Sequence, residues 1–406
     1  MNKSSCHEPS PENAARVRRR RMQRRKALSR LTDHVTHDFR ASLTVVREYA
    51  SLMQDGLCGD VNDEQRHALA VIDDRADELG QMIDDLLDLS KMHTGRMALL
   101  RRTCRVAEIV EPLLPWLEKK AALKGLAVET EVDDGLPAVF CDPEMIGRAL
   151  VSLAVHAVKS CGNSGRILVW ALEDRQKRQM TLGVTGNGSR VGQDGPPHDF
   201  GQYEAPARKR RNGQKGFRLG LSVAKKLVHR NFGELTELPT DGPGTALACS
   251  LPLSIPEEIL QRYLLRLHQG PRSRAAVSAA RAWVEAPHDS DSIASIDKLF
   301  HFALRPDDLV FRIGKAEWMF VLAEKCPGES RFLARLEDVR KDIDRHRLRG
   351  ELPEIEMKME GAWSLAADTS DVLSRIVMLL TPLETRHATI DDAPAGQILE
   401  NAAASA

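Results

Sequence analysis

The stretch Thr36-His37-Asp38-Phe39-Arg40-Ala41-Ser42-Leu43 lies within a long helical pattern near the start of the 406-residue chain. Apolar residues recur through this pattern at offsets of three, four and seven, at Leu31, Val35, Phe39, Val46, Ala50 and Met53. The spacing predicts an amphipathic helix that ends near Asp55-Gly56. A histidine one step off the apolar stripe is exposed, and the carboxylate after it can orient the imidazole for attack on a phosphoryl group.

A second apolar stripe follows a short connection over residues 56–62. Its members alternate steps of three and four and are Leu69, Ile72, Ala76, Leu79, Ile83 and Leu86. The short connection predicts an antiparallel helical hairpin within residues 16–95. Two helices cannot bury two such stripes between themselves, so we expect a homodimer that forms a four-helix bundle.

Beyond Gly95 the pattern changes to that of an α/β protein. Strand-like segments at 127–132, 166–172, 179–184 and 245–251 alternate with helical ones, which predicts an α/β sandwich over residues 100–253. A separate small α/β domain is predicted over 256–385, with helices at 291–304, 330–347 and 369–380 and strands at 309–312, 318–323 and 355–365. The ends, residues 1–15 and 386–406, are predicted to be disordered.

The charge balance excludes no class outright but favours neither nucleic acid nor an acidic partner, because 58 Lys and Arg face 58 Asp and Glu. The basic runs at 16–26 and 208–211 are interpreted as solvated faces or loops. Nucleic-acid binding through the first run, Arg16 to Lys26, is the weakest alternative that we carry.

No window approaches the ~20 apolar residues of a membrane-spanning helix, and we find no signal peptide, so we expect a cytoplasmic protein. The seven cysteines lack CxxC spacing. They therefore predict neither a zinc site nor a disulfide framework, and are interpreted as small buried hydrophobic residues.

The series of motifs from about residue 28 to 253 resembles the two-component histidine kinases. Residues 37–43 are similar to the H-box of that family, usually written H-E-L-R-T-P-L. In the expected order follow Leu86-Leu87-Asp88-Leu89-Ser90-Lys91, Gly95-Arg96, Pro137-Ala138 and Asp142-Pro143. The resemblance implies a dimeric hairpin with His37 as phosphoacceptor and Asp38 as its orienting carboxylate, an ATP-binding sandwich of the GHKL type, and a response regulator receiver domain as partner.

Within the H-box, Ala41 and Ser42 replace the Thr and Pro of the family. The Thr position helps to place the water that dephosphorylates a partner, so the resemblance does not imply phosphatase activity here.

The resemblance also locates a nucleotide site, and its first segment is altered. The N-box N-x-x-x-N-A-x-K corresponds to residues 152–159, where Ser152 and His156 replace the asparagines and Lys159 remains for a phosphate contact. Imidazole nitrogen is a poor ligand for Mg²⁺, which prefers oxygen. His156 is therefore interpreted as a changed wall of the site, and no metal ligand is predicted.

The two glycine boxes are altered as well. The first, D-x-G-x-G, reads Val184-Thr185-Gly186-Asn187-Gly188, so the acceptor for the adenine amino group is lost, at a cost of about 1–3 kcal/mol. The second, G-x-G-L-G-L, begins at Gly216 and has Arg218 as its middle residue, where the backbone must approach phosphates closely. An Arg there could instead supply positive charge, but we favour obstruction.

These changes together predict that ATP turnover is weak or lost. If ATP with Mg²⁺ is bound nonetheless, the phosphate side would be lined by Lys159, Gly186, Gly188 and Gly220.

The third domain carries a second resemblance. Residues 305–318 are similar to the region around the GGDEF signature of diguanylate cyclases, and Gly314 and Glu317 are kept. The other signature positions hold Lys315, Ala316 and Trp318, so we predict no cyclase activity, which needs two cations held by carboxylates.

Arg305 and Asp308 keep the R-x-x-D spacing of the product-binding inhibitory site of that family. The resemblance thus suggests cyclic di-GMP as a ligand. The alternative interpretation is a helix end and turn before a strand, in a domain that serves as a dimerisation or docking platform.

We therefore expect a phosphorelay protein in which His37 exchanges a phosphoryl group with a receiver aspartate. The alternative from another class is a non-enzymatic pseudokinase scaffold that binds receiver domains or other histidine kinases, regulated through the third domain, for instance by cyclic di-GMP.

Overall fold

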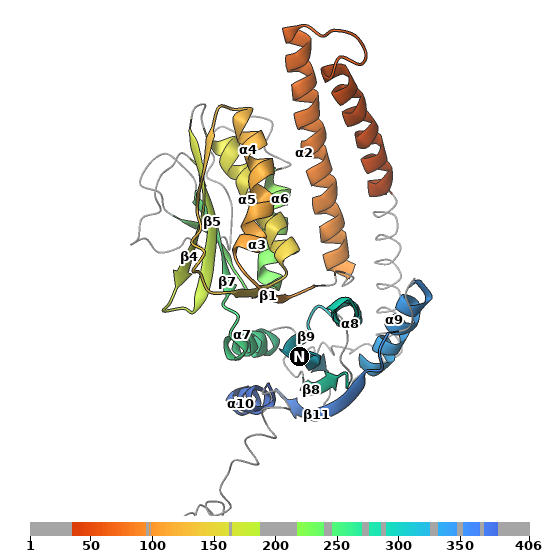
Figure 1. Ribbon diagram of the computed structural model, residues 1–406. Coiled ribbons are helices and arrows are strands. Elements are labelled where there is room, and N and C mark those ends of the chain that lie inside the picture. The colour runs from red at the N-terminus through yellow and green to blue at the C-terminus, as the bar shows by residue number, and fades with distance from the viewer. Residues whose placement is uncertain are drawn as a thin grey trace, which may run out of the picture. The chain divides into compact units, whose positions relative to one another are not determined.

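A computed structural model describes most of the chain (Figure 1). The described residues are 35–94, 97, 99–161, 165–186, 217–238, 246–269, 276–285, 290–324, 332–346, 352–365 and 369–380. Both predicted disordered ends and both basic runs lie outside them. The chain divides into two compact units, Met1–Met97 with Ala205–Val223, and Ala98–Glu204 with Ala224–Ala406. In the described part, no helix combines the length and the apolar character needed to cross a membrane.

The first unit contains the predicted helical hairpin, which is confirmed. One helix covers residues 35–54, and α2 covers Asp63–Thr94. α2 begins with a reciprocal capping box, because the main-chain N–H of Asn62 donates to Gln65 Oε1 at 2.9 Å and that of Gln65 to Asn62 Oδ1 at 2.8 Å.

Ion pairs hold the two helices together along their length. Arg47 lies 3.2 Å from Asp77 and 3.5 Å from Asp73 on α2, and Arg40 pairs with Asp84. A later residue of the first helix thus pairs with earlier residues of α2, as an antiparallel hairpin requires.

The apolar stripe of α2 divides into two lines. One line, Leu69, Ala76 and Ile83, is buried. The other, displaced by three residues, is Ile72, Leu79 and Leu86, whose exposed fractions are 44%, 50% and 44%. The hairpin thus buries one line and leaves the second open to solvent.

The second unit contains a five-stranded sheet in the order β2-β4-β5-β7-β6. β2 pairs in parallel with β4, and the other neighbours are antiparallel. The strands are β2 Ala127–Glu131, β4 Arg166–Asp174, β5 Gln179–Gly186, β6 Leu235–Leu238 and β7 Ala246–Pro252. Helix α4 (Leu114–Ala122) packs beside β2 and α5 (Pro143–Ser160) packs on β5 and β7. The predicted α/β sandwich is confirmed.

Shorter elements complete the sandwich. β1 (Arg102–Cys104) pairs with β3 (Val139–Cys141) in a separate two-stranded sheet. The remaining elements are α3 Ala107–Val110, the 3₁₀ turn η1 Glu111–Leu113 and α6 Phe217–Arg230.

The C-terminal part forms a second α/β layer structure. After α7 (Pro256–Gln269) come β8 Ala276–Trp283, α8 Ser290–Ala303, β9 Leu309–Gly314, β10 Glu317–Glu324, α9 Phe332–His346, β11 Glu356–Ser364 and α10 Thr369–Leu379. The sheet order is β11-β8-β10-β9 and all pairs are antiparallel. From β8 to β11 this is the β-α-β-β-α-β arrangement of ferredoxin-like folds. The central strand β8 has no counterpart in the sequence prediction.

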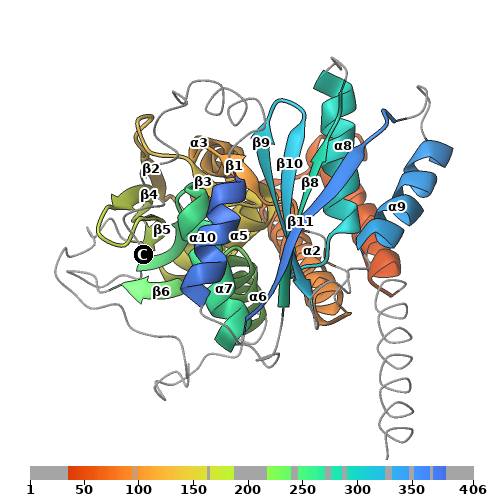
Figure 2. The ribbon, with the colours of Figure 1, turned by 90° about the horizontal axis from the view of Figure 1, so that it is seen from below.

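Helices cover both faces of this sheet, α8 and α9 on one and α7 and α10 on the other (Figure 2). The α7 and α10 side has a core that also includes Phe140 and Phe232 of the sandwich. The ring of Phe140 stacks on that of Phe311 in β9, with centroids 5.5 Å apart. The predicted boundary near residues 253–256 therefore falls between parts that share one hydrophobic core.

Candidate functional site

His37 lies on the first helix with its imidazole directed to solvent. Its side chain is 83% exposed, and that of Asp38 is 69% exposed. The imidazole Nδ1 lies 3.7 Å from Asp38 Oδ1, which is an ion-pair distance rather than a hydrogen bond. The nitrogen is therefore accessible to a phosphoryl donor, and a small rotation of Asp38 would allow it to orient the ring.

The three predicted N-box residues lie on α5 at offsets of four and three, on one side of the helix. Ser152 is buried, and its hydroxyl donates to the carbonyl of Arg148 at 3.3 Å. His156 is half-buried, with Nδ1 at 3.4 Å from Ser160 Oγ. Burial lowers the pKa of His156 from 6.5 to about 4, so the ring is neutral at physiological pH. Lys159 is exposed in the last turn.

The first glycine box lies at the end of β5, next to this helix. A Cβ atom built on Gly186 would meet Cys161 Sγ at 2.7 Å and the carbonyl oxygen of Ala157 at 3.2 Å. The structure thus brings the end of α5 and Gly186 together, and only glycine fits between them.

Val184, two residues earlier on the same face of β5, is 1% exposed and is flanked by Val169 and Leu247 on the neighbouring strands. Both flanking residues are apolar, so the strand offers no polar side chain where the family has its adenine acceptor. Thr185 points to the other face, where its hydroxyl accepts from Trp170 Nε1 at 2.9 Å.

The other predicted nucleotide residues are only partly described. Gly188 and Gly216 lie outside the described residues, as does the side chain of Arg218, whose main chain is helical in the first turn of α6. Gly220 is half-buried in the same helix.

In the third domain, Arg305 and Asp308 form a turn before β9. The N–H of Asp308 donates to the carbonyl of Arg305 at 2.9 Å, and the Asp308 carboxylate accepts from the N–H groups of Arg305 (2.8 Å) and Ala323 (3.1 Å). Arg335 pairs with the same carboxylate at 3.2 Å. Burial raises the pKa of Asp308, while these donors oppose the shift.

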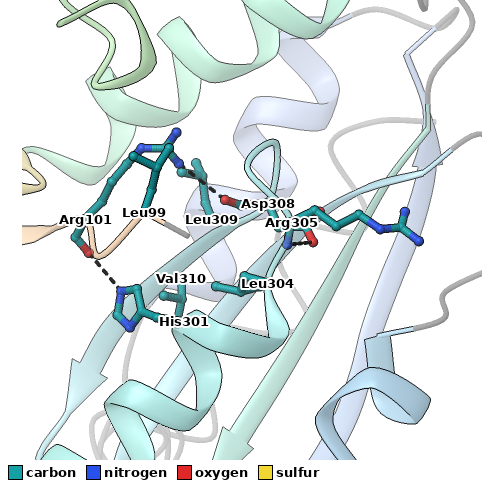
Figure 3. A pocket seen from close by; sticks show the side chains of 8 residues that line it. All are labelled: Leu99, Arg101, His301, Leu304, Arg305, Asp308, Leu309 and Val310. Atoms are coloured by element: carbon teal, nitrogen blue, oxygen red, sulfur yellow. Dashed lines mark hydrogen bonds between the residues drawn. The ribbon is translucent and has the colours of Figure 1, made fainter. Parts of the chain in front are cut away.

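Beside this turn is a hollow shown in Figure 3, in which the side chain of Arg305 points away from Asp308. The hollow is lined by Leu99, Arg101, His301, Leu304, Arg305, Asp308, Leu309 and Val310. The oxygens of Asp308 are engaged by the protein itself, so the R-x-x-D spacing has a structural explanation, and a cyclic di-GMP site stays a prediction without a contact that favours it.

Two residues of the GGDEF-like loop, the kept Glu317 and the replaced position Trp318, also serve the fold. Glu317 is buried and pairs with the fully buried Arg281, which lies 3.4 Å from Glu360. Trp318 is 1% exposed, and its Nε1 donates to Asp297 Oδ1 at 2.6 Å. In the described part of the chain, no three His, Cys, Asp or Glu side chains converge as metal ligands would.

A buried polar network on the sandwich was not found by sequence reasoning. Asp142 caps α5 by accepting from the N–H of Met145 at 3.1 Å, and its second oxygen accepts from the N–H of Leu100 at 2.8 Å. The N–H of Asp142 donates to Asn231 Oδ1 at 2.8 Å. The pair Asp142-Pro143 is a helix-start signal, but its long-range partners leave no local pattern.

Two domain families match the chain. Residues 27–95 match the His Kinase A (phospho-acceptor) domain, and residues 141–255 match the histidine kinase-, DNA gyrase B- and HSP90-like ATPase family.

Relatives agree with this assignment. An uncharacterized sensor-like histidine kinase of Rhizobium meliloti is 26% identical over 230 residues, which are 56% of this chain and 43% of that protein. The circadian input-output histidine kinase CikA of Synechococcus elongatus is 26% identical over 54% of this chain and 29% of its own length. This chain thus spans less than half the length of either relative.

Among solved structures, full-length ShkA in complex with AMPPNP is 20% identical, with a TM-score of 0.39, over 55% of this chain and 46% of that one. Residues 27–95 and 141–255 are thus similar to the phospho-acceptor and ATPase domains of histidine kinases.

The neutral His156 makes stability depend on pH. The pKa of His156 is about 4 in the folded chain and 6.5 in the unfolded chain. Between pH 4 and pH 6.5 the unfolded chain therefore binds a proton at this residue that the folded chain does not bind. The free energy of unfolding should therefore fall as the pH drops from 6.5 to 4, by about 3 kcal/mol from this group. Urea unfolding of the wild type and of His156→Asn measures it.

In His156→Asn the fall over this window should be smaller by that amount. His67→Asn, which removes an exposed histidine of α2, is the matched control and should keep the wild-type slope. Equal slopes in the wild type and His156→Asn would contradict the prediction.

Proposed function

We propose that the chain is a histidine-kinase-like phosphorelay protein that exchanges a phosphoryl group between His37 and the aspartate of a response regulator receiver domain. The observation that carries the proposal is the exposed imidazole of His37 beside Asp38, on a hairpin that matches phosphoacceptor domains. A structural histidine would be packed or hydrogen-bonded, whereas this side chain is 83% exposed.

The chemistry requires little of the protein beyond this placement. A ring nitrogen of His37 attacks the phosphorus of an aspartyl phosphate, the N–P bond forms as the O–P bond breaks, and the receiver carboxylate leaves. In the reverse direction the carboxylate attacks and the imidazole leaves. Neither direction uses ATP, so the exchange does not depend on the nucleotide site.

Self-association through the hairpin is part of the proposal. The first helix also has a line of exposed apolar residues, Phe39, Val46 and Met53, whose exposed fractions are 54%, 45% and 43%. An apolar patch of this regularity is typical of an interface rather than of a solvated surface. A second hairpin would bury both lines in a four-helix bundle.

Replacing Leu79 by lysine should weaken this association. The lysine would place a charge in the middle of the exposed line, where burying it is unfavourable, so we expect the dimer dissociation constant to rise about tenfold or more. Sedimentation velocity measures it. Leu123→Lys, at a leucine that is 59% exposed beyond α4, is the matched control. Equal dimer dissociation constants for Leu79→Lys and Leu123→Lys would contradict the proposed four-helix bundle.

The autokinase activity is proposed to be weak or lost, and the site geometry supports this. His156 is neutral and offers nitrogen where Mg²⁺ prefers oxygen. Val184 is flanked by apolar residues where adenine needs an acceptor.

Restoring the family residues should restore nucleotide binding. Val184→Asp in a Ser152→Asn, His156→Asn background should raise Mg-ATP affinity roughly ten- to a hundredfold over the same background with Val184. Titration calorimetry measures it. GTP is the matched control, because guanine carries a carbonyl oxygen at the position where adenine has the amino group that would donate to the carboxylate. Tight Mg-ATP binding by the wild type would overturn the proposal of a degenerate site.

The phosphoacceptor role is tested by label transfer. Wild type incubated with a phosphorylated receiver domain should gain label at His37, because an exposed imidazole next to a carboxylate is a competent nucleophile. His37→Ala should gain none. His67→Ala, which removes another exposed histidine of the hairpin, should be labelled like the wild type.

A parallel mixture with labelled ATP and Mg²⁺ separates the sources of the phosphoryl group. Label there that is lost in His37→Ala identifies an active kinase. Label in neither mixture contradicts the phosphorelay and leaves the non-enzymatic scaffold, which binds receiver domains or other histidine kinases.

A further inference from the structure

The short sheet of β1 and β3 brings two cysteine thiols together. The strands are antiparallel, with Cys104 opposite Val139 and Cys141 opposite Arg102. Residues two apart in a strand point to the same face, so Cys104 and Cys141 are diagonal neighbours on one face of the pair. Their sulfur atoms lie 3.6 Å apart, although the residues are 37 positions apart in the chain. The sulfur atoms of a disulfide are about 2.0 Å apart, so a bond requires a movement of only about 1.5 Å.

The two other buried cysteines of the described chain have different surroundings. Cys249 in β7 is fully buried, and burial raises its pKa to about 12, so its thiol stays protonated. The Sγ of Cys161, at the end of α5, lies 3.8 Å from the carbonyl oxygen of Arg166. The contact between Cys104 and Cys141 therefore does not follow from burial alone.

The two thiols of the pair differ in how readily they lose a proton. A hydrogen bond from the Cys141 thiol lowers the pKa of Cys104, and the nearby charge of Arg102 acts in the same direction. The same hydrogen bond, together with burial, raises the pKa of Cys141. The thiolate is the reactive form of cysteine. Cys104 is therefore suited to attack an oxidant, and Cys141 is placed to react with the product.

The position of the pair limits the oxidant to a small molecule. Cys104 is 2% exposed and Cys141 is fully buried. Arg102 and Thr103, immediately before Cys104, are exposed, and β1 has only three residues and pairs with one strand. A strand this short, with a partner on one side, opens more readily than a central strand. Such an opening admits hydrogen peroxide more easily than a bulky disulfide reagent.

We propose that Cys104 and Cys141 are a redox-sensitive pair that hydrogen peroxide converts to a disulfide. The Cys104 thiolate attacks one peroxide oxygen, so that an S–O bond forms, the O–O bond breaks and hydroxide leaves. The sulfur of Cys141 then attacks the Cys104 sulfenic acid. The S–S bond forms as the S–O bond breaks, and the second oxygen leaves as water with the proton of Cys141. Two thiols lose two electrons, and one hydrogen peroxide becomes two waters.

The disulfide would form beside the polar network at the start of α5. Cys141 is followed by Asp142, whose N–H donates to Asn231 Oδ1 at 2.8 Å. The Asp142 carboxylate caps α5 and accepts from the N–H of Leu100 at 2.8 Å. Oxidation would therefore add a covalent link between β1 and the strand that leads directly into α5. The chemistry of the pair uses neither the phosphoacceptor nor a nucleotide, so it does not rest on the function proposed above.

Peptide mapping of the oxidised full-length chain tests the pair. Cys6 and Cys326, which lie outside the described residues, are replaced by serine, and the folded protein is treated with hydrogen peroxide. Free thiols are then blocked with N-ethylmaleimide before digestion with trypsin. Peptides 103–105 and 125–148 should be recovered joined, and dithiothreitol should separate them. The exposed Cys58 records that the oxidant has acted, and near-ultraviolet circular dichroism records that the protein is still folded.

Two serine variants control the result. Cys104→Ser should lose the joined peptides completely. Cys161→Ser, which removes another buried cysteine of the same sandwich, is the matched control and should keep them. The map of the protein that keeps both thiols decides the question even if Cys104→Ser does not fold. Joined peptides that are missing from folded protein with oxidised Cys58, or peptide 125–148 joined to Cys249 instead, would overturn the proposal.

A trapping experiment tests the order of the two steps. In Cys141→Ser the serine hydroxyl can still donate to the neighbouring sulfur, but it cannot complete the disulfide. The sulfenic acid should therefore accumulate at Cys104, where dimedone captures it. In Cys104→Ser, dimedone should capture nothing at Cys141. Capture at Cys141 and not at Cys104 would contradict the assignment of Cys104 as the attacking thiol.

Discussion

The hydrogen bonds of the Asp142 carboxylate hold together the parts on which the second unit depends. One oxygen caps α5, the helix that carries Ser152, His156 and Lys159, and the other fixes Leu100. The carboxylate is 3% exposed, so losing either donor would leave a buried acceptor unsatisfied, which costs about 1–3 kcal/mol. The orientation of α5 and the path of the entering chain are therefore set by one side chain.

The sequence predicted those parts of the fold in which local pattern and tertiary environment agree. The hairpin follows from apolar residues at helical spacing, and β4, β5 and β7 from runs of β-branched and apolar residues. The strand β8, Ala-Val-Ser-Ala-Ala-Arg-Ala-Trp, was missed because its alanines favour a helix in isolation. In the fold this strand is central and covered by helices on both faces, where small side chains are required, and burial overrides propensity.

At the candidate site, too, only the residues that belong to a local sequence motif could be predicted. His37 and the end of β5 were singled out from short motifs, and in the structure Gly186 lies against the end of α5. The contact between Cys104 and Cys141 was missed, because the two residues lie 37 positions apart in the chain. Contacts at such separations leave no periodicity in one sequence. The spacing of Arg305 and Asp308, which suggested a ligand, is explained by a turn whose carboxylate binds its own backbone.

In the proposed phosphoryl exchange, exposure and burial distinguish the side chain that would accept phosphate from the site that would bind ATP. The His37 side chain is 83% exposed, so the imidazole keeps its access to solvent. On α5 the His156 side chain, which stands where the family has asparagine, is neutral and partly buried, and the neighbouring strand β5 presents Val184. A chain that transfers phosphate from ATP needs polar groups at these two positions. Without them the adenine amino group has no acceptor and Mg²⁺ lacks an oxygen ligand, and both losses weaken nucleotide binding. A chain that receives phosphate from another protein needs only an accessible imidazole and a sandwich that folds, and the buried residues of α5 and β5 serve that second requirement.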